Sequence, residues 1–162
     1  MPHPRKLLVT YAPDGRSHWR ILRHYHGSYE SEFELRPLDG PEPTVRNALD
    51  SVRKSMVGSS LLLLILSPGI ASLDRVDLEI QAAIRPDRGC SRIGLLGLRL
   101  SSAFEGDTTG YPPRFSDNLR TGYAAVRPWP ASEADFQKYI SDADERRRYS
   151  TPDYSRPLRG HP

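Results

Sequence analysis

A single acidic side chain is the strongest candidate for chemistry in this sequence. Glu79 borders an apolar stripe that includes Val76 and Ile80. A carboxylate at the margin of such a stripe can point into a cleft, where burial disfavours its charge while Arg75, one helical turn earlier, favours the charge and orients the group. The alternative is an ordinary i, i+4 ion pair on the surface, worth about 0.2–0.5 kcal/mol. Spacing alone favours that surface pair.

Sequence motifs for several other chemistries are absent. No Gly-rich dinucleotide fingerprint, Walker-type Gly-Lys-Ser/Thr or Gly-x-Ser-x-Gly elbow occurs. The central predicted strand ends in Ser67 rather than in the acceptor aspartate of a response regulator. His24 and His26 are two residues apart and would not face one site on a helix, so no metal site is predicted. Cys90 is the sole cysteine, and we expect it to be dispensable.

The elements that must position Glu79 follow from an alternation of apolar patterns. Short apolar or alternating runs predict strands over residues 6–11, 32–38, 61–66, 93–100 and 123–126. Stripes at helical spacing predict helices over 17–25, 44–57 and 72–85, and a last helix from residue 132 onward. The predicted helix caps are Thr44, Ser72 and Ser132. A long loop is predicted from residue 101 to about 120.

This alternation is typical of right-handed βαβ crossovers around a parallel sheet. We therefore predict one α/β domain over residues 1–150, flavodoxin-like, with five parallel strands in the order 2-1-3-4-5 and helices on both faces. Residues 151–162 form a Pro- and Arg-rich tail that reads as extended or disordered. Ligands of such sheets bind beyond the carboxyl ends of the strands, here between strands one and three. Residues 11–16, residues 67–70 and the helix that follows them lie at that point.

Composition limits the possible classes of protein. The 162 residues are 37% hydrophobic and 27% charged, which suits one globular domain. The longest apolar run, Leu61–Leu66, is far shorter than the roughly 20 residues of a membrane span, and no signal-peptide core is visible. A cytoplasmic location without a membrane partner is expected. The net charge of +3 is spread along the chain except at Arg146–Arg148 and in the tail, so nucleic acid is not an expected partner.

A family resemblance gives Glu79 a more specific meaning. The segment 60–84 combines an aliphatic strand, Ser-Pro, a short loop and Val-Asp-Leu-Glu-Ile, and it resembles the core of bacterial TIR-like domains. The resemblance is closest to the TIR-like proteins of the Thoeris anti-phage system. Supporting pieces are residues 5–11, Trp19-Arg20, residues 115–119 and Trp129. The resemblance covers about residues 5 to 145.

The resemblance implies an enzyme that consumes NAD. In that family a glutamate on this helix cleaves NAD at the nicotinamide–ribose bond, and the matching position here is Glu79. The products are ADP-ribose or its cyclised or conjugated forms, which activate a separate effector protein, and the domains self-associate into homo-oligomers. NAD is thus a substrate, and no cofactor or metal is implied. The chain departs from the family at Arg75, where a Trp is usual.

If NAD is the substrate, the chemistry of residues near the predicted switch point gives them possible roles in binding it. Tyr11 and Trp19 could stack on a base or pyridine ring, although aromatic residues on short helices mostly belong to the core. The other candidate substrate-binding residues are polar, namely Asp14, Arg16, Arg20, Ser67 and Arg75. Two alternatives remain open: a TIR-like self-association module without catalysis, and an enzyme similar to nucleoside deoxyribosyltransferases, which also use a glutamate on a flavodoxin-like sheet.

Overall fold

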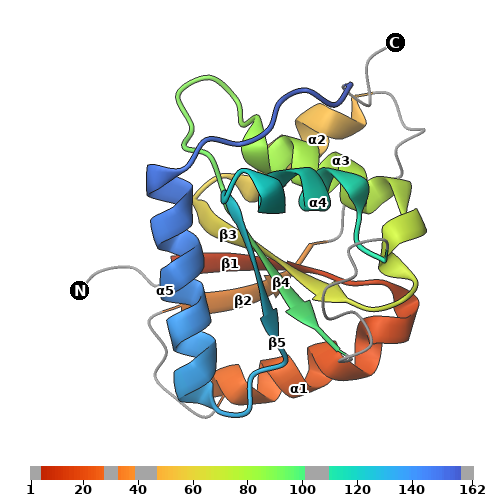
Figure 1. Ribbon diagram of the computed structural model, residues 1–162, viewed down its shortest axis with the longest axis vertical. Helices are drawn as coiled ribbons and strands as arrows, with labels where there is room; N and C mark the ends of the chain where they lie inside the picture. Colours follow the sequence, from red (N-terminus) through yellow and green to blue (C-terminus); the bar gives the residue numbers. More distant parts are fainter. Residues whose placement is uncertain (1–4, 28–32, 39–46, 101–109, 158–162) are drawn as a thin grey trace.

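The computed structural model describes residues 5–27, 33–38, 47–100 and 110–157, which form a sheet with helices on either side (Figure 1). The strands are β1 (Arg5–Thr10), β2 (Phe33–Pro37), β3 (Ser59–Leu66), β4 (Gly94–Arg99) and β5 (Ala124–Pro128). The α-helices are α1 (Arg16–Gly27), α2 (Ala48–Met56), α3 (Asp74–Ile84), α4 (Pro113–Arg120) and α5 (Glu133–Tyr149). Two short 3-10 helices, η1 (Pro13–Gly15) and η2 (Ile70–Ser72), follow β1 and β3.

The sheet has the predicted topology. Its five strands run in the order β2-β1-β3-β4-β5, and every pairing is parallel. The central strand β3 buries all six aliphatic residues of Leu61–Leu66, as a strand covered on both faces must. The strands after β1 are added first on one side of it, as β2, and then on the other, as β3, so the switch point lies between β1 and β3, whose register pairs Thr10 with Leu64. The flavodoxin-like α/β fold is therefore confirmed.

Alternate residues of the strands separate two apolar cores. Leu7 and Val9 of β1 face the core covered by α1 and α5, to which Trp19, Leu22 and Phe136 contribute. Leu8 faces the opposite core, which α2, α3 and α4 cover (Figure 1). The two-residue period of a strand dictates this division. Helix α3, which carries Glu79, thus lies on the second face, between α2 and α4, and packs on β4.

Helix α3 is more deeply buried than its sequence suggests. The pattern predicted one apolar stripe, whereas every residue from Val76 to Ile84 is buried, including Asp77, Glu79 and Gln81. Only its first turn reaches solvent. A helix buried all round is usually apolar all round, so the polar residues of α3 need partners within the protein.

The predicted loop over residues 101–120 is wrong in its second half, because helix α4 occupies it. Pro113 starts this helix, as proline does where its missing N–H is not needed. Its buried face consists of Arg114, Phe115, Asp117 and Asn118, so only one of four buried residues is apolar. No apolar stripe marks such a helix in the sequence. The first half of the predicted loop lies outside the described residues.

The predicted helix caps have different outcomes. Ser132 caps α5 as predicted, with its hydroxyl accepting a hydrogen bond from the backbone N–H of Asp135 at 3.2 Å. Ser72 does not cap α3, because it belongs to η2 and donates to the carbonyl of Gly69 at 3.3 Å. Thr44 lies outside the described residues. In the part of the chain that the structure describes, no helix has both the length and the hydrophobicity to cross a bilayer.

The first half of the tail, residues 151–157, follows α5 without helix or strand; we call it the C-terminal strap. It runs along the outer side of the layer formed by α3 and α4, on the side of the molecule away from α1 (Figure 1). The backbone N–H of Asp153 donates to Asn118 Oδ1 at 2.9 Å. The guanidinium of Arg85 donates to the carbonyl of Tyr154 at 2.7 Å and lies over its ring. The strap is thus extended and fixed to α4 and to the residue that follows α3.

The packing of α4 on the sheet gives a test of the fold. Gly97 of β4 faces α4, and a Cβ there would lie 2.7 Å from both Leu66 Cδ1 and Phe115 Cζ. Because the buried Phe115 ring cannot turn aside easily, Gly97→Ala should lower the free energy of unfolding by about 1–3 kcal/mol. Urea denaturation measures this, with the exposed Ser141→Ala of α5 as a control. Equal midpoints for the two variants would contradict the tight α4–β4 contact.

Candidate active site at the carboxyl ends of β1 and β3

The side chain of Glu79, on α3, lies against the carboxyl end of β1, where the sequence predicted a site. This side chain is 0% exposed, and its Oε1 accepts hydrogen bonds from Thr10 Oγ1 at 3.3 Å and from Arg75 Nη1 at 3.0 Å. The interpretation as an ordinary surface pair is therefore wrong, because the acidic partner is fully buried. A carboxylate in such surroundings is held in one orientation, as a positioned functional group must be.

Arg75 links the start of α3 to the end of β1. Besides Glu79, its Nη1 lies 3.2 Å from Thr10 Oγ1, and its Nη2 donates to the carbonyl of Tyr11 at 2.6 Å. Its side chain is 24% exposed. Because the arginine reaches solvent and the glutamate does not, the guanidinium is part of the cover over the carboxylate.

Asp14 braces the two loops at the switch point. Its Oδ1 accepts from Ser67 Oγ at 2.6 Å, and its Oδ2 accepts from the backbone N–H of Gly69 at 2.9 Å. The contact joins η1, after β1, to the turn after β3. A Cβ at residue 69 would lie 3.0 Å from Asp14 Oδ1, so glycine permits this approach. Asp14 therefore uses both of its carboxylate oxygens within the protein.

The other predicted substrate-binding residues are arranged less favourably. The rings of Tyr11 and Trp19 stack on one another, with centroids 5.9 Å apart and planes 16° apart. Trp19 is 6% exposed and belongs to the core under α1, so its ring is occupied by packing. Arg16 and Arg20 lie on α1 with exposed side chains. The structure thus gathers five predicted residues at the sheet edge, namely Tyr11, Asp14, Ser67, Arg75 and Glu79.

Two contributors to the site were missed by sequence reasoning. Thr10 donates to Glu79, and its only signal is a polar residue ending an apolar strand. Asp77, two residues before Glu79, faces another side of α3, where it is buried in a two-bond ion pair with Arg114. Nothing in the spacing could reveal this pair, because its residues are 37 positions apart.

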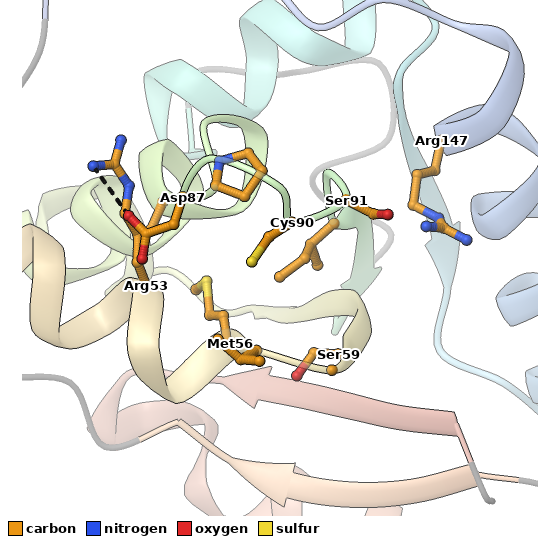
Figure 2. Close-up of a pocket in the computed structure, with 12 residues that line it drawn as sticks. Arg53, Met56, Ser59, Asp87, Cys90, Ser91 and Arg147 are labelled. Atoms are coloured by element: carbon orange, nitrogen blue, oxygen red, sulfur yellow. Dashed lines mark ion pairs between the residues drawn. The ribbon is translucent and has the colours of Figure 1, made fainter.

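A separate cavity of about 300 Å³ opens at the opposite edge of the sheet (Figure 2). It lies where β3 begins, at Ser59, whereas Glu79 lies near the end of that strand's neighbour. Cys90 and Met56 point into it, and Arg53 and Arg147 flank it. Within the described ranges, no group of three or more His, Cys, Asp or Glu side chains is arranged to hold a metal ion.

Comparison with known proteins adds no relative: no protein-family model, curated protein or solved structure matches this chain. Function must therefore be inferred from the residues at the sheet edge.

The Asp14 brace predicts a measurable effect on stability. Asp14→Ala would leave the buried hydroxyl of Ser67 without the acceptor that it now has, and loss of such a partner costs about 1–3 kcal/mol. Thermal or urea unfolding should show this loss. The control is Asp50→Ala, an exposed aspartate whose contact to Arg53 is 3.8 Å long, and it should change stability by less than about 0.5 kcal/mol. Equal effects would contradict a bracing role for Asp14.

Proposed function

We propose that the chain is a TIR-like enzyme that cleaves NAD at the nicotinamide–ribose bond, with Glu79 as its catalytic carboxylate. One observation carries the proposal: Glu79 is fixed by Thr10 and Arg75 at the carboxyl end of β1, at the switch point of a flavodoxin-like sheet. Ligands of open α/β sheets bind there. The product is an ADP-ribose-derived signal of anti-phage defence, which a separate effector protein senses.

The chemistry suits a fixed carboxylate without a metal. When the bond between the ribose C1′ and the nicotinamide nitrogen breaks, its electron pair leaves with nicotinamide, which becomes neutral. The ribose passes through an oxocarbenium-like state, as in glycoside hydrolysis. Glu79 stabilises this positive charge or holds the ribose hydroxyls. Water then bonds to C1′ and loses a proton to the solvent, which gives the linear product, or a nucleophile within the substrate itself bonds to C1′ and gives a cyclic one.

Substrate access requires Arg75 to leave its resting position. Glu79 is 0% exposed, and Arg75 both contacts and helps to cover it. An arginine binds phosphate oxygens through the same two-pronged geometry with which it binds carboxylates. We infer that the pyrophosphate of NAD draws the Arg75 guanidinium away from Glu79 and Tyr11. In this way substrate binding uncovers the carboxylate.

The same cover favours a second candidate function. A TIR-like module that has lost catalysis and acts by self-association has no need of an accessible glutamate. The Arg75–Glu79 pair, with its acid fully buried, would then be a structural tie between α3 and β1. The two candidates differ in a single assay, because only the enzyme releases nicotinamide from NAD.

The role of Glu79 is tested by removing its charge while keeping its shape. Glu79→Gln should reduce nicotinamide release by on the order of a hundredfold or more, as for other positioned catalytic carboxylates. Thermal unfolding of the variant shows whether it remains folded. A matched control is Glu145→Gln on the exposed face of α5, which should retain full activity. Asp77→Asn is unsuitable as a control, because Asp77 is paired with Arg114.

Two results would contradict this assignment. Equal release from wild type and Glu79→Gln would exclude Glu79 as the catalytic group. No release from wild type, at high protein concentration and with lysate of phage-infected cells added, would favour the self-association module.

The role of Arg75 is tested with a substrate that lacks phosphate. Arg75→Met keeps the length of the side chain but removes its charge-assisted hydrogen bonds, each worth about 1.5–3 kcal/mol. We expect the KM for NAD to rise roughly tenfold to a hundredfold. Cleavage of nicotinamide riboside, which has no phosphate, should change by less than about threefold. Equal losses on both substrates would mean that Arg75 acts only by orienting Glu79.

A further inference from the structure

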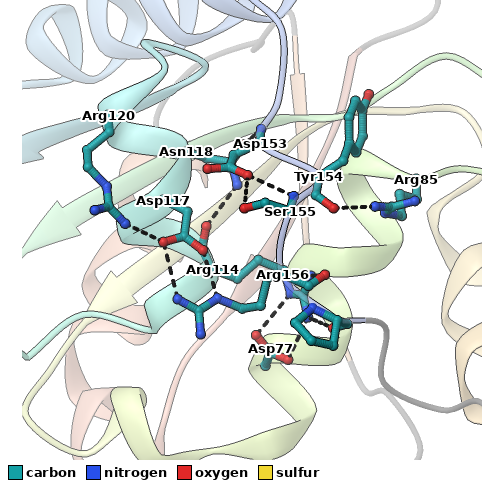
Figure 3. A network of polar contacts seen from close by, with 11 residues as sticks. Asp77, Arg85, Arg114, Asp117, Asn118, Arg120, Asp153, Tyr154, Ser155 and Arg156 are labelled. Carbon is teal, nitrogen blue, oxygen red and sulfur yellow. Dashed lines mark hydrogen bonds and ion pairs between the residues drawn. The ribbon is translucent and has the colours of Figure 1, made fainter.

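The largest fully buried side chain of the described structure is charged. Arg114 of α4 is 1% exposed and donates from Nε and Nη2 to the two carboxylate oxygens of Asp77, at 3.0 and 3.3 Å (Figure 3). Asp77 lies on α3, two residues before Glu79. A buried guanidinium carries five N–H donors, and donors that stay unpaired away from water are costly. Asp77 accounts for two of these donor contacts.

The C-terminal strap provides further acceptors for the same guanidinium. Arg114 Nη2 donates to the carbonyl of Pro157 at 2.8 Å, and Nη1 lies 3.5 Å from the carbonyl of Arg156. Arg114 thus joins two segments that are far apart in the sequence, the catalytic helix α3 and the end of the strap. Figure 3 shows Arg114, Arg156 and Asp77 close together.

The strap is fastened to α4 by a second ion pair. Arg156 donates from Nε to Asp117 Oδ2 at 2.7 Å and from Nη2 to Oδ1 at 3.2 Å. This hydrogen bond to Arg156 is the main reason that the pKa of Asp117 lies below its usual value, so Asp117 is ionised at neutral pH. Arg120 contacts the same carboxylate from α4 itself, and it acts on the strap only through charge, at the exposed Asp153.

The geometry holds α3 from two sides. Residues two apart on a helix point in directions about 200° apart. Arg75 therefore fastens one side of α3 to the end of β1, while Asp77 fastens the other to α4 and the strap. Glu79 lies one turn beyond Arg75, within hydrogen-bond reach of Thr10 only while α3 keeps its distance from β1.

We propose that the C-terminal strap positions the catalytic helix α3. Arg156 binds the strap to Asp117, and the strap carbonyls in turn accept hydrogen bonds from Arg114. Arg114 holds Asp77 in place, and this fixes the position of Glu79 on the same helix. Arg114 and Arg156 are positioning residues, because neither touches Glu79 or Thr10. Without the strap carbonyls, the buried guanidinium of Arg114 loses hydrogen-bond acceptors, and its ion pair with Asp77 becomes less well ordered. The effect on catalysis rests on the proposed function, whereas the effect on α3 does not.

The experiment compares Arg156→Gln, Arg156→Lys and Arg120→Gln in the full chain. Arg156→Gln and Arg120→Gln each remove one arginine from the same carboxylate, but only the first releases the strap. We expect Arg156→Gln to increase hydrogen exchange of the α3 amides about tenfold or more and to lower kcat for nicotinamide release about tenfold, with KM within about twofold. Arg156→Lys should restore part of both. Arg120→Gln should match wild type.

Two results would overturn the proposal about the strap. Unchanged α3 exchange in Arg156→Gln would overturn the proposal, whatever the activity. If Arg120→Gln had the same effects as Arg156→Gln, the proposal would also be overturned. The effects would then come from the loss of a partner for Asp117 and not from release of the strap. If wild type releases no nicotinamide, the proposed function fails, and the exchange data alone then decide whether the strap positions α3. Thermal unfolding of all three variants shows that they are folded at the temperature of measurement.

Discussion

Helix α3 must bury charged side chains on two sides, and much of the molecule is arranged around that need. Its buried span from Val76 to Ile84 includes Asp77 and Glu79. An ionised carboxylate away from water is tolerated only with a partner, and removing one partner of a buried pair costs about 3–5 kcal/mol. Glu79 has Arg75 and Thr10, while Asp77 has Arg114. These partners lie on three different elements, α3 itself, β1 and α4. Together they fix the position of α3.

The apolar sheet provides the fixed frame for these polar contacts. Strand β3 is covered on both faces, and β1 lies beside it in a register that brings Thr10 to the edge. Asp14 then joins the loops that follow these two strands. Close-packed layers do not deform continuously, so polar groups at their edge keep fixed distances. Under the proposed function, this rigidity is what holds a carboxylate against a developing positive charge.

The fold could be predicted because its signals are local. Six consecutive aliphatic residues mark β3, apolar stripes mark α2 and α3, and Ser132 marks the start of α5. The pairing of Arg75 with Glu79 was also accessible, because it spans one helical turn. What spacing could not give was burial, which depends on α2, α4 and the sheet closing around α3. That closure turns an apparent surface pair into a buried one.

Helix α4 and the strap could not be predicted for a related reason. Their contacts replace an apolar stripe by pairs of charged residues distant in sequence, as in Arg114 with Asp77 and Arg156 with Asp117. Hydrophobic periodicity does not reveal such pairs, because a charged residue taken alone in the sequence is expected to be exposed to solvent. Trp19 shows the converse, since a residue proposed for substrate stacking is used by the core.

Arg75 stands where the TIR-like domains that the sequence resembles usually carry a tryptophan, and under the proposed function this difference has a physical consequence. A tryptophan in that position would cover Glu79 by packing alone and would be indifferent to anions. The arginine covers it through hydrogen bonds that an anionic ligand can replace. Its three acceptors, on Glu79, Thr10 and Tyr11, are also contacts that fasten α3 to β1. Loosening them would transfer the task of holding α3 to Asp77, Arg114 and the strap. Under the proposed function the two sides of the helix are therefore complementary: the side that opens to substrate is held by exchangeable bonds, and the side that stays in place is held by the buried ion pair.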